Sequence, residues 1–378
     1  MSNKILTRLY NRVCCFVLFL VAASASFNGF YDECHFHEVG VAGDWEVDGF
    51  ERMVDGTANR PYVYRQLLPT TANWIEKVVP QTIKTRLYNR QGSRPHAYIN
   101  SMSYSPTVKN NVYFFRYLVT YIATFLFTLL AVYAMYFVCK AVGVSLPAAV
   151  LSPVIVILLL PYIMSDSGFN YDFPELAFMA LAVWIALKFD WWWSIPIAAL
   201  GTWNKESFLL FIPALYPLFR RRSPRFGALL RVATLCSVCL VVYLPIHLRF
   251  AHNPGSTVVV QWLDQLQFFA HPRILLFSTQ QTYGLRVPKA FSAIPMCLLF
   301  WTMWRGWRHL SPMMKRHGQI AAAINIPLYL FFCTPGELRD LSMLYVLFLL
   351  VLAGNLKEWI GGCGVKTDAT MVDQTLVL

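Results

Sequence analysis

The sequence predicts an all-α fold, a polytopic bundle of about ten transmembrane helices. Of the 378 residues, 57% are hydrophobic and 14% are charged, whereas charged residues make up about a quarter of an ordinary soluble domain. Several apolar runs approach the ~20 residues that a helix needs to cross a hydrocarbon layer of ~30 Å. A transmembrane β-barrel would instead show ~10-residue segments of alternating polarity, and the chain has no such series.

The first predicted span, Val13–Phe27, follows three basic residues and allows two interpretations. Ala23-Ser24-Ala25 resembles a signal-peptidase site, but the apolar character continues through Phe30, which favours an uncleaved anchor. The other predicted spans are Val112–Cys139, Gly143–Met164, Phe173–Phe189, Trp191–Trp203, Phe208–Phe219, Phe226–His247, Val287–Trp304, Ile320–Cys333 and Leu341–Leu356. Of these, Trp191–Trp203 and Phe208–Phe219 are either two short spans or one broken pair.

These spans divide the chain into four predicted parts. They are a signal-anchor helix (1–27), an exoplasmic loop with an interfacial helix (28–111), a transmembrane bundle (112–356) and a disordered cytoplasmic tail (357–378). The basic residues that would lie in cytoplasmic loops are Lys140, Lys188, Arg220, Arg221, Arg222, Arg225, Arg305, Arg308, Lys315, Arg316 and Lys357. Positive charge in short loops marks the cytoplasmic side, so both termini are predicted to lie there.

The net charge of +12 then indicates contact with anionic membrane lipids and needs no nucleic acid as partner. The acids follow a different pattern, because several lie at the mouths of spans, as do Asp172, Glu175, Glu206 and Glu337. The orientation rule does not explain acids in such places. Ionisable groups near a membrane are costly and mark either a site or a paired structural network.

The segment Arg60–Pro69 alternates charged Arg60 and Arg65 with aromatic residues and prolines. Apolar residues then recur at helical spacing to Val79, which is typical of a helix in the headgroup layer. A basic, aromatic site at a lipid surface suggests a lipid phosphate as its ligand, bound by an arginine fork.

The acidic loop Asp44–Asp48 precedes this segment and offers candidate catalytic groups. A carboxylate near the membrane surface acts as general base on a sugar hydroxyl or holds a divalent metal on a pyrophosphate. His35, His37 and Glu38 offer a second place for a divalent metal. The alternative is a solvated acidic loop whose arginines bind headgroups, and the sequence does not establish a metal cofactor.

Two polar turns interrupt the later spans. Asn204–Ser207 breaks an apolar stretch, as happens where a helix lines a cavity, or else is a tight turn in which Lys205 and Glu206 pair. Thr334–Asp340 carries Glu337 and Arg339, which complete the same cavity or only form a turn.

The order of these features resembles bacterial polytopic proteins related to the GT-C glycosyltransferases. The motifs that carry the resemblance are Pro61–Pro69, Asn204–Ser207 and Glu337–Arg339, and together they extend over most of the chain. The soluble C-terminal domain of many GT-C enzymes is missing, since only a short tail follows Leu356. The resemblance implies a bacterial inner-membrane protein with a GT-C-like bundle that uses a polyprenyl-phosphate-linked sugar.

By the same resemblance, Asp48 or Asp44 is the essential acid of the first outer loop and deprotonates the acceptor. Arg65, Lys205 and Arg339 would hold the donor phosphate, with Arg60, Glu206 and Glu337 completing the substrate site. Two other classes remain open. A non-enzymatic assembly factor explains the missing soluble domain, and a transporter of lipid-linked glycan explains the broken helix, although the chain has no clear internal repeat.

Overall fold

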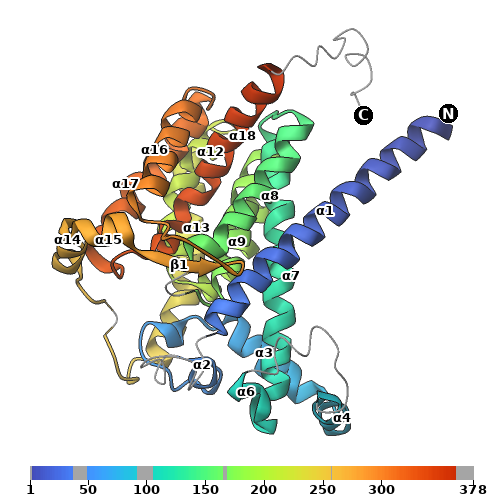
Figure 1. Ribbon diagram of the computed structural model, residues 1–378, viewed down its shortest axis with the longest axis vertical. Helices are drawn as coiled ribbons and strands as arrows, with labels where there is room; N and C mark the ends of the chain where they lie inside the picture. Colours follow the sequence, from blue (N-terminus) through green and yellow to red (C-terminus); the bar gives the residue numbers. More distant parts are fainter. Residues whose placement is uncertain (1, 37–48, 92–104, 165–167, 257, 363–378) are drawn as a thin grey trace.

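The computed structural model describes residues 2–36, 49–91, 105–164, 168–256 and 258–362 (Figure 1). The described chain is helical except for one two-stranded hairpin. Its long helices run side by side, and a group of short helices covers one end of the bundle (Figure 1). The predicted helical class is confirmed, and five of the described helices are long and apolar enough to cross a membrane, as a multi-pass membrane protein requires.

The predicted number of about ten spans is wrong. The five candidates are Tyr10–Cys34, Asn111–Ala141, Leu146–Ile163, Arg225–Arg249 and Leu338–Gly361. The other predicted spans form helices that are too short or too polar. The helix α16 (Ala293–Trp307) has 15 residues, which rise only ~22 Å against a hydrocarbon layer of ~30 Å. In α17 (Pro312–Phe332), the first turns carry Lys315, Arg316 and His317.

The N-terminal helix α1 (Ser2–Cys34) extends seven residues beyond the predicted end of the first span. It packs against α7 (Asn111–Ala141) and α8 (Leu146–Ile163), and aromatic side chains of its last turns contact α7 and the start of α9 (Asp172–Lys188). The ring of Phe30 meets that of Phe173 edge-on at 5.2 Å. The hydroxyls of Tyr31 and Tyr117 lie 2.6 Å apart. These buried contacts explain why the helix continues into the segment predicted as loop.

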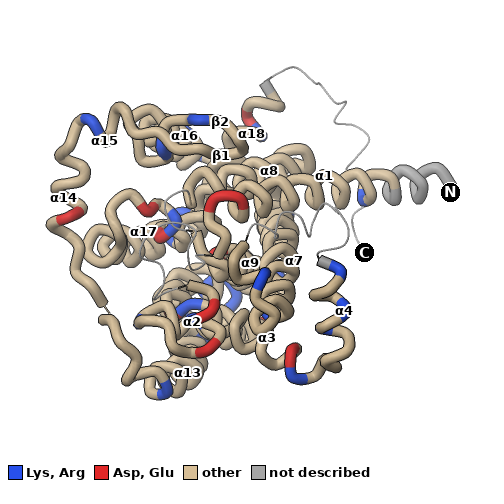
Figure 2. Tube along the Cα trace, turned by 60° about the horizontal axis from the view of Figure 1, so that its bottom comes forward, with Lys and Arg blue, Asp and Glu red and all other residues tan. Residues whose placement is uncertain are grey.

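Five short helices cover the lower end of the bundle in Figure 1. They are α2 (Phe50–Asp55), the 3₁₀ turn η2 (Tyr62–Tyr64), α3 (Leu67–Val78), α4 (Gln81–Gln91) and α6 (Pro106–Lys109). The predicted helix after Arg65 is therefore present as α3. It buries Leu67, Leu68 and Ala72, and it leaves the side of Trp74 and Val78 65% exposed. Its position at a membrane surface stays a prediction. Figure 2 shows α4 with several Lys and Arg residues.

The helix α9 (Asp172–Lys188) occupies the centre of the bundle, between α7 and α10 (Ser194–Asn204). Small and apolar residues such as Ala177, Ala180 and Val183 bury most of its surface. After η3 (Trp191–Trp193) and α10, the chain turns back through α11 (Phe208–Phe211), η4 (Ile212–Leu215) and α12 (Tyr216–Arg220). The structure thus favours the broken pair over two complete spans for residues 191–219.

The second half contains α13 (Arg225–Arg249), α14 (Trp262–Ala270), α15 (Pro272–Phe277), α16, α17, η5 (Leu338–Leu344) and α18 (Tyr345–Gly362). Between α15 and α16 lies an antiparallel hairpin, β1 (Thr279–Thr282) and β2 (Leu285–Pro288), with Thr279 opposite Pro288. Its turn residues Tyr283 and Gly284 have φ of 54° and 76°, as a tight hairpin turn requires. The all-α prediction missed this hairpin, and α16 begins at Ala293 rather than Val287.

The basic loops gather at the end of the bundle where α1 begins and α18 ends (Figure 1). At this end Arg308 Nη2 lies 2.6 Å from Glu358 Oε1. The short helices α2 to α6 lie at the opposite end. The start of α1 and the end of α18 thus lie at the same end of the bundle, and the orientation in the membrane stays a prediction.

Cysteine labelling of intact cells tests that orientation. In a background without native cysteines, Thr85→Cys on α4 should react with an impermeant reagent from outside. Arg221→Cys at the basic end should react only after the membrane is permeabilised. Both positions are exposed, so access decides the result. Labelling of Arg221→Cys but not Thr85→Cys in intact cells would show the opposite orientation.

Candidate functional site

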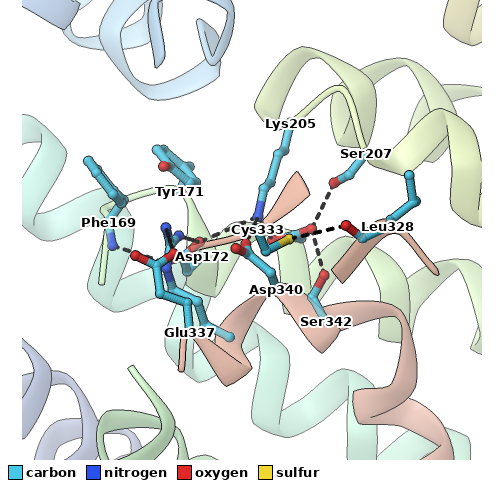
Figure 3. A network of polar contacts seen from close by, with 12 residues as sticks. Phe169, Tyr171, Asp172, Lys205, Ser207, Leu328, Cys333, Glu337, Asp340 and Ser342 are labelled. Atoms are coloured by element: carbon cyan, nitrogen blue, oxygen red, sulfur yellow. Dashed lines mark hydrogen bonds and ion pairs between the residues drawn. The ribbon is translucent and has the colours of Figure 1, made fainter. Parts of the chain in front are cut away.

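A cluster of charged side chains is buried where the start of α9, the break between α10 and α11, and η5 meet (Figure 3). Each of these three segments contributes charged residues that lie at the end of a helix. Asp172 and Glu175 lie in the first turn of α9, Lys205 follows the last residue of α10, and Glu337 and Arg339 lie at the start of η5. We call these five residues, with Arg65, Glu206 and Asp340, the ionic cluster.

Lys205 lies among three carboxylates, and Figure 3 shows its side chain pointing toward Asp340. Its Nζ is 2.8 Å from Glu175 Oε2, 3.5 Å from Asp340 Oδ1 and 3.9 Å from Asp172 Oδ1. Burial alone would lower the pKa of Lys205, but the three carboxylates outweigh burial and hold that pKa above its usual value. Lys205 therefore keeps its charge at all physiological pH values.

Arg339 bridges two carboxylates on the other side of the cluster. Its Nη1 is 3.3 Å from both carboxylate oxygens of Asp172, and its Nη2 is 3.0 Å from Glu337 Oε2. The guanidinium also lies over the ring of Phe169, 5.0 Å from its centroid. Because Arg339 is buried, these contacts replace the water that its charge would otherwise need.

The two acids of α9 are held by hydrogen bonds as well as by cations. The Phe169 backbone N–H donates to Asp172 Oδ2 at 2.8 Å. The hydroxyls of Ser207 and Ser342 both donate to Glu175 Oε1, at 2.9 and 2.8 Å. A helix N-terminus also favours negative charge, so the first turn of α9 is a suitable place for both carboxylates.

Arg65 lies at the more open edge of the cluster. Its Nη2 is 3.6 Å from Glu206 Oε1, whose side chain is 29% exposed. Its guanidinium lies over the ring of Tyr171, 4.3 Å from the centroid, and Nη1 donates to the Tyr171 hydroxyl. A backbone bond from Gln66 N to Trp203 O at 3.2 Å holds this segment against α10. Arg65 Nε and Glu206 Oε2 are buried, and within the described part of the chain they have no hydrogen-bond partner.

The ionic cluster carries more acids than bases. Asp172, Glu175, Glu206, Glu337 and Asp340 outnumber Arg65, Lys205 and Arg339 by two. An anionic ligand would therefore have to take the place of a carboxylate. Within the described residues, no group of three or more His, Cys, Asp or Glu side chains could hold a metal ion. The proposed histidine site includes His37 and Glu38, which lie outside the described residues.

The structure brings together five of the eight residues that the sequence suggested for a site, namely Arg65, Lys205, Glu206, Glu337 and Arg339. Arg60 has other contacts. Its backbone N donates to Pro254 O at 2.9 Å and its Nη2 to Gly255 O at 2.6 Å, so it fastens the loop after α13. The candidate catalytic acids Asp44 and Asp48 lie outside the described residues.

Sequence reasoning did not assign four members of this site. Asp172 and Glu175 stood out as acids at the mouth of a span, but nothing in their pattern named a partner. Asp340 and Tyr171 were not singled out. A signal was present, because Tyr-Asp-x-x-Glu before an apolar run is typical of a helix start with acids in the first turn. Comparison with protein families, curated proteins and solved structures finds no match.

Proposed function

We propose that this multi-pass membrane protein is a glycosyltransferase-like enzyme that moves a sugar from a polyprenyl-phosphate donor at the exoplasmic face. The observation that supports the proposal is the convergence of Arg65, Lys205 with Glu206, and Glu337 with Arg339 in one cluster. Over 130 residues separate Lys205 from Asp340 in the sequence. These are the three segments that carry the resemblance to GT-C enzymes.

Within this proposal, Arg65 is the residue that contacts the donor phosphate. Among the described residues its one carboxylate partner is Glu206, at 3.6 Å, and its Nε has no hydrogen-bond partner there. A phosphate oxygen can replace the Glu206 carboxylate, since both accept charge-assisted hydrogen bonds from the same fork. Lys205 and Arg339 each have several buried carboxylate partners. They position the acids and do not contact the phosphate.

The proposed reaction is an inverting transfer. Asp48, or Asp44, removes the proton from the acceptor hydroxyl, and the acceptor oxygen attacks the anomeric carbon. The bond from that carbon to the phosphate oxygen breaks, and polyprenyl phosphate leaves with the electron pair. Arg65 stabilises the negative charge that develops on the departing phosphate.

A binding experiment with a polyprenyl-phosphate sugar tests the proposal. Arg65→Gln should weaken binding by at least about tenfold, since it removes the charge of a bidentate donor. The matched control is Arg116→Gln. Arg116 is similarly buried and pairs with Asp55 at 3.2 Å and Glu76 at 3.3 Å, outside the ionic cluster. The Arg116→Gln variant should lower the stability of the protein and leave its affinity per folded molecule unchanged. Equal affinity for wild type and Arg65→Gln would remove Arg65 from the site.

One observation favours a different function. Inside the cluster, Lys205 and Arg339 each form ion pairs with carboxylates, and a purely structural network requires the same pairs. A membrane assembly factor that keeps the fold without the reaction fits that observation. Under it, wild-type protein binds no polyprenyl-phosphate sugar at all, which the same experiment detects. Uptake into sealed vesicles would instead indicate a transporter.

A further inference from the structure

A cavity of about 920 Å³ opens at the basic end of the bundle, away from the ionic cluster. It lies where α7, α9 and α12 end and α17 begins, and Ala141, Leu187, Tyr216 and Pro312 are among its lining residues. Its volume is that of small-molecule sites, which span ~300–1,000 Å³. The proposed sugar transfer makes no use of it.

Three arginines line this cavity, and Arg221 and Arg316 are available to a ligand. Arg220 donates from Nη1 to Ser223 O at 3.0 Å. Arg221 and Arg316 are exposed, and in the described ranges neither forms an ion pair with a carboxylate. No acidic side chain is among the described residues that line the cavity. The nearby Arg308 differs, because Glu358 binds it at 2.6 Å.

Apart from the polar Ser311 and Gln319, the rest of the lining is apolar and suited to hydrocarbon. Along α17, Ile320 and Ala323 follow Arg316 on the cavity side. Seven residues of helix rise ~10 Å, so the lining passes from charged to apolar over about that depth. Val142, Pro217 and Met313 add further apolar surface. A ligand that fits has a compact negative head and an apolar chain. Anionic phospholipids have both parts, and basic pockets between helices on the cytoplasmic side bind such headgroups.

We propose that this cavity binds one anionic phospholipid from the leaflet at the basic end, with its phosphate between Arg221 and Arg316 and an acyl chain along α17. The start of α17 adds a favourable partial positive charge, since Ser311 caps it and Pro312 is its first residue. A lipid with a zwitterionic headgroup lacks the net negative charge that would balance Arg221 and Arg316.

The test uses the full-length protein in detergent, with lipid binding followed by native mass spectrometry and by thermal shift. Phosphatidylglycerol should bind and raise the Tm, and phosphatidylcholine should bind at least about tenfold more weakly. Arg221→Gln with Arg316→Gln should reduce phosphatidylglycerol affinity by at least about tenfold. The matched control is Arg273→Gln with Arg286→Gln, two exposed arginines on α15 and β2, which should leave affinity unchanged.

A second variant tests the apolar part without touching the charges. Ala323→Phe narrows the lining along α17 and should weaken long-chain phosphatidylglycerol while leaving the response to inorganic phosphate as in the wild type. Three results would overturn the proposal: equal affinity for phosphatidylcholine, unchanged affinity in the double arginine variant, or a thermal shift from inorganic phosphate as large as that from the lipid. The last result would make the cavity a site for a free anion.

Discussion

Lys205→Met should destabilise the protein by about 3–5 kcal/mol, because it leaves buried carboxylates without their cation. Three carboxylate oxygens lie within 3.9 Å of Lys205 Nζ, and both Glu175 and Asp172 are buried. Methionine keeps the length of the side chain, so the change isolates the charge. We expect the Tm in detergent to fall by at least about 5 °C.

The matched control for this variant is Lys188→Met, at the exposed last residue of α9. It should leave the Tm unchanged within about 1 °C, since surface substitutions cost little. Adding Glu175→Gln to Lys205→Met should recover part of the loss, because one buried charge is then removed together with its partner. A Tm for Lys205→Met equal to that of the wild type would show that the three contacts contribute no net stability.

The sequence predicted the helical class correctly because apolar composition and run length determine it. It predicted too many spans because an apolar run does not reveal where a helix stops. Pro213 and Pro217 divide residues 208–220 into α11, η4 and α12, as proline does when it removes backbone donors. The sequence also did not predict the hairpin before α16. Its strands have four residues each, too few for an alternating pattern to stand out.

The sequence predicted which residues belong to the candidate site better than it predicted which of them form ion pairs. Polar turns between apolar runs are visible in the sequence, so Arg65, Lys205 and Arg339 could be chosen. The partner Asp172 could not be chosen in the same way, because 167 residues separate it from Arg339, and no local pattern encodes a contact at that distance. The excess of acids follows only from those pairings. Because the acids are in excess, carboxylates already bind Lys205 and Arg339. We therefore assign the proposed phosphate contact to Arg65.

Arg339→Met should cost about 3–5 kcal/mol, since Asp172 and Glu337 then lose a shared buried cation. Arg339→Lys should fall between this variant and the wild type, because an ammonium keeps the charge but cannot reach both carboxylates with a planar fork. The measurement is the Tm of each variant in detergent.

The same two preparations also separate the structural role of Arg339 from a role in binding. We expect the affinity of folded Arg339→Lys for a polyprenyl-phosphate sugar to equal that of the wild type, because both Nη groups of Arg339 already bind carboxylates. A normal Tm with an affinity at least about tenfold lower would contradict this result. It would place the donor phosphate against Arg339, as the sequence first suggested, and Glu337 would then be the carboxylate that the phosphate displaces.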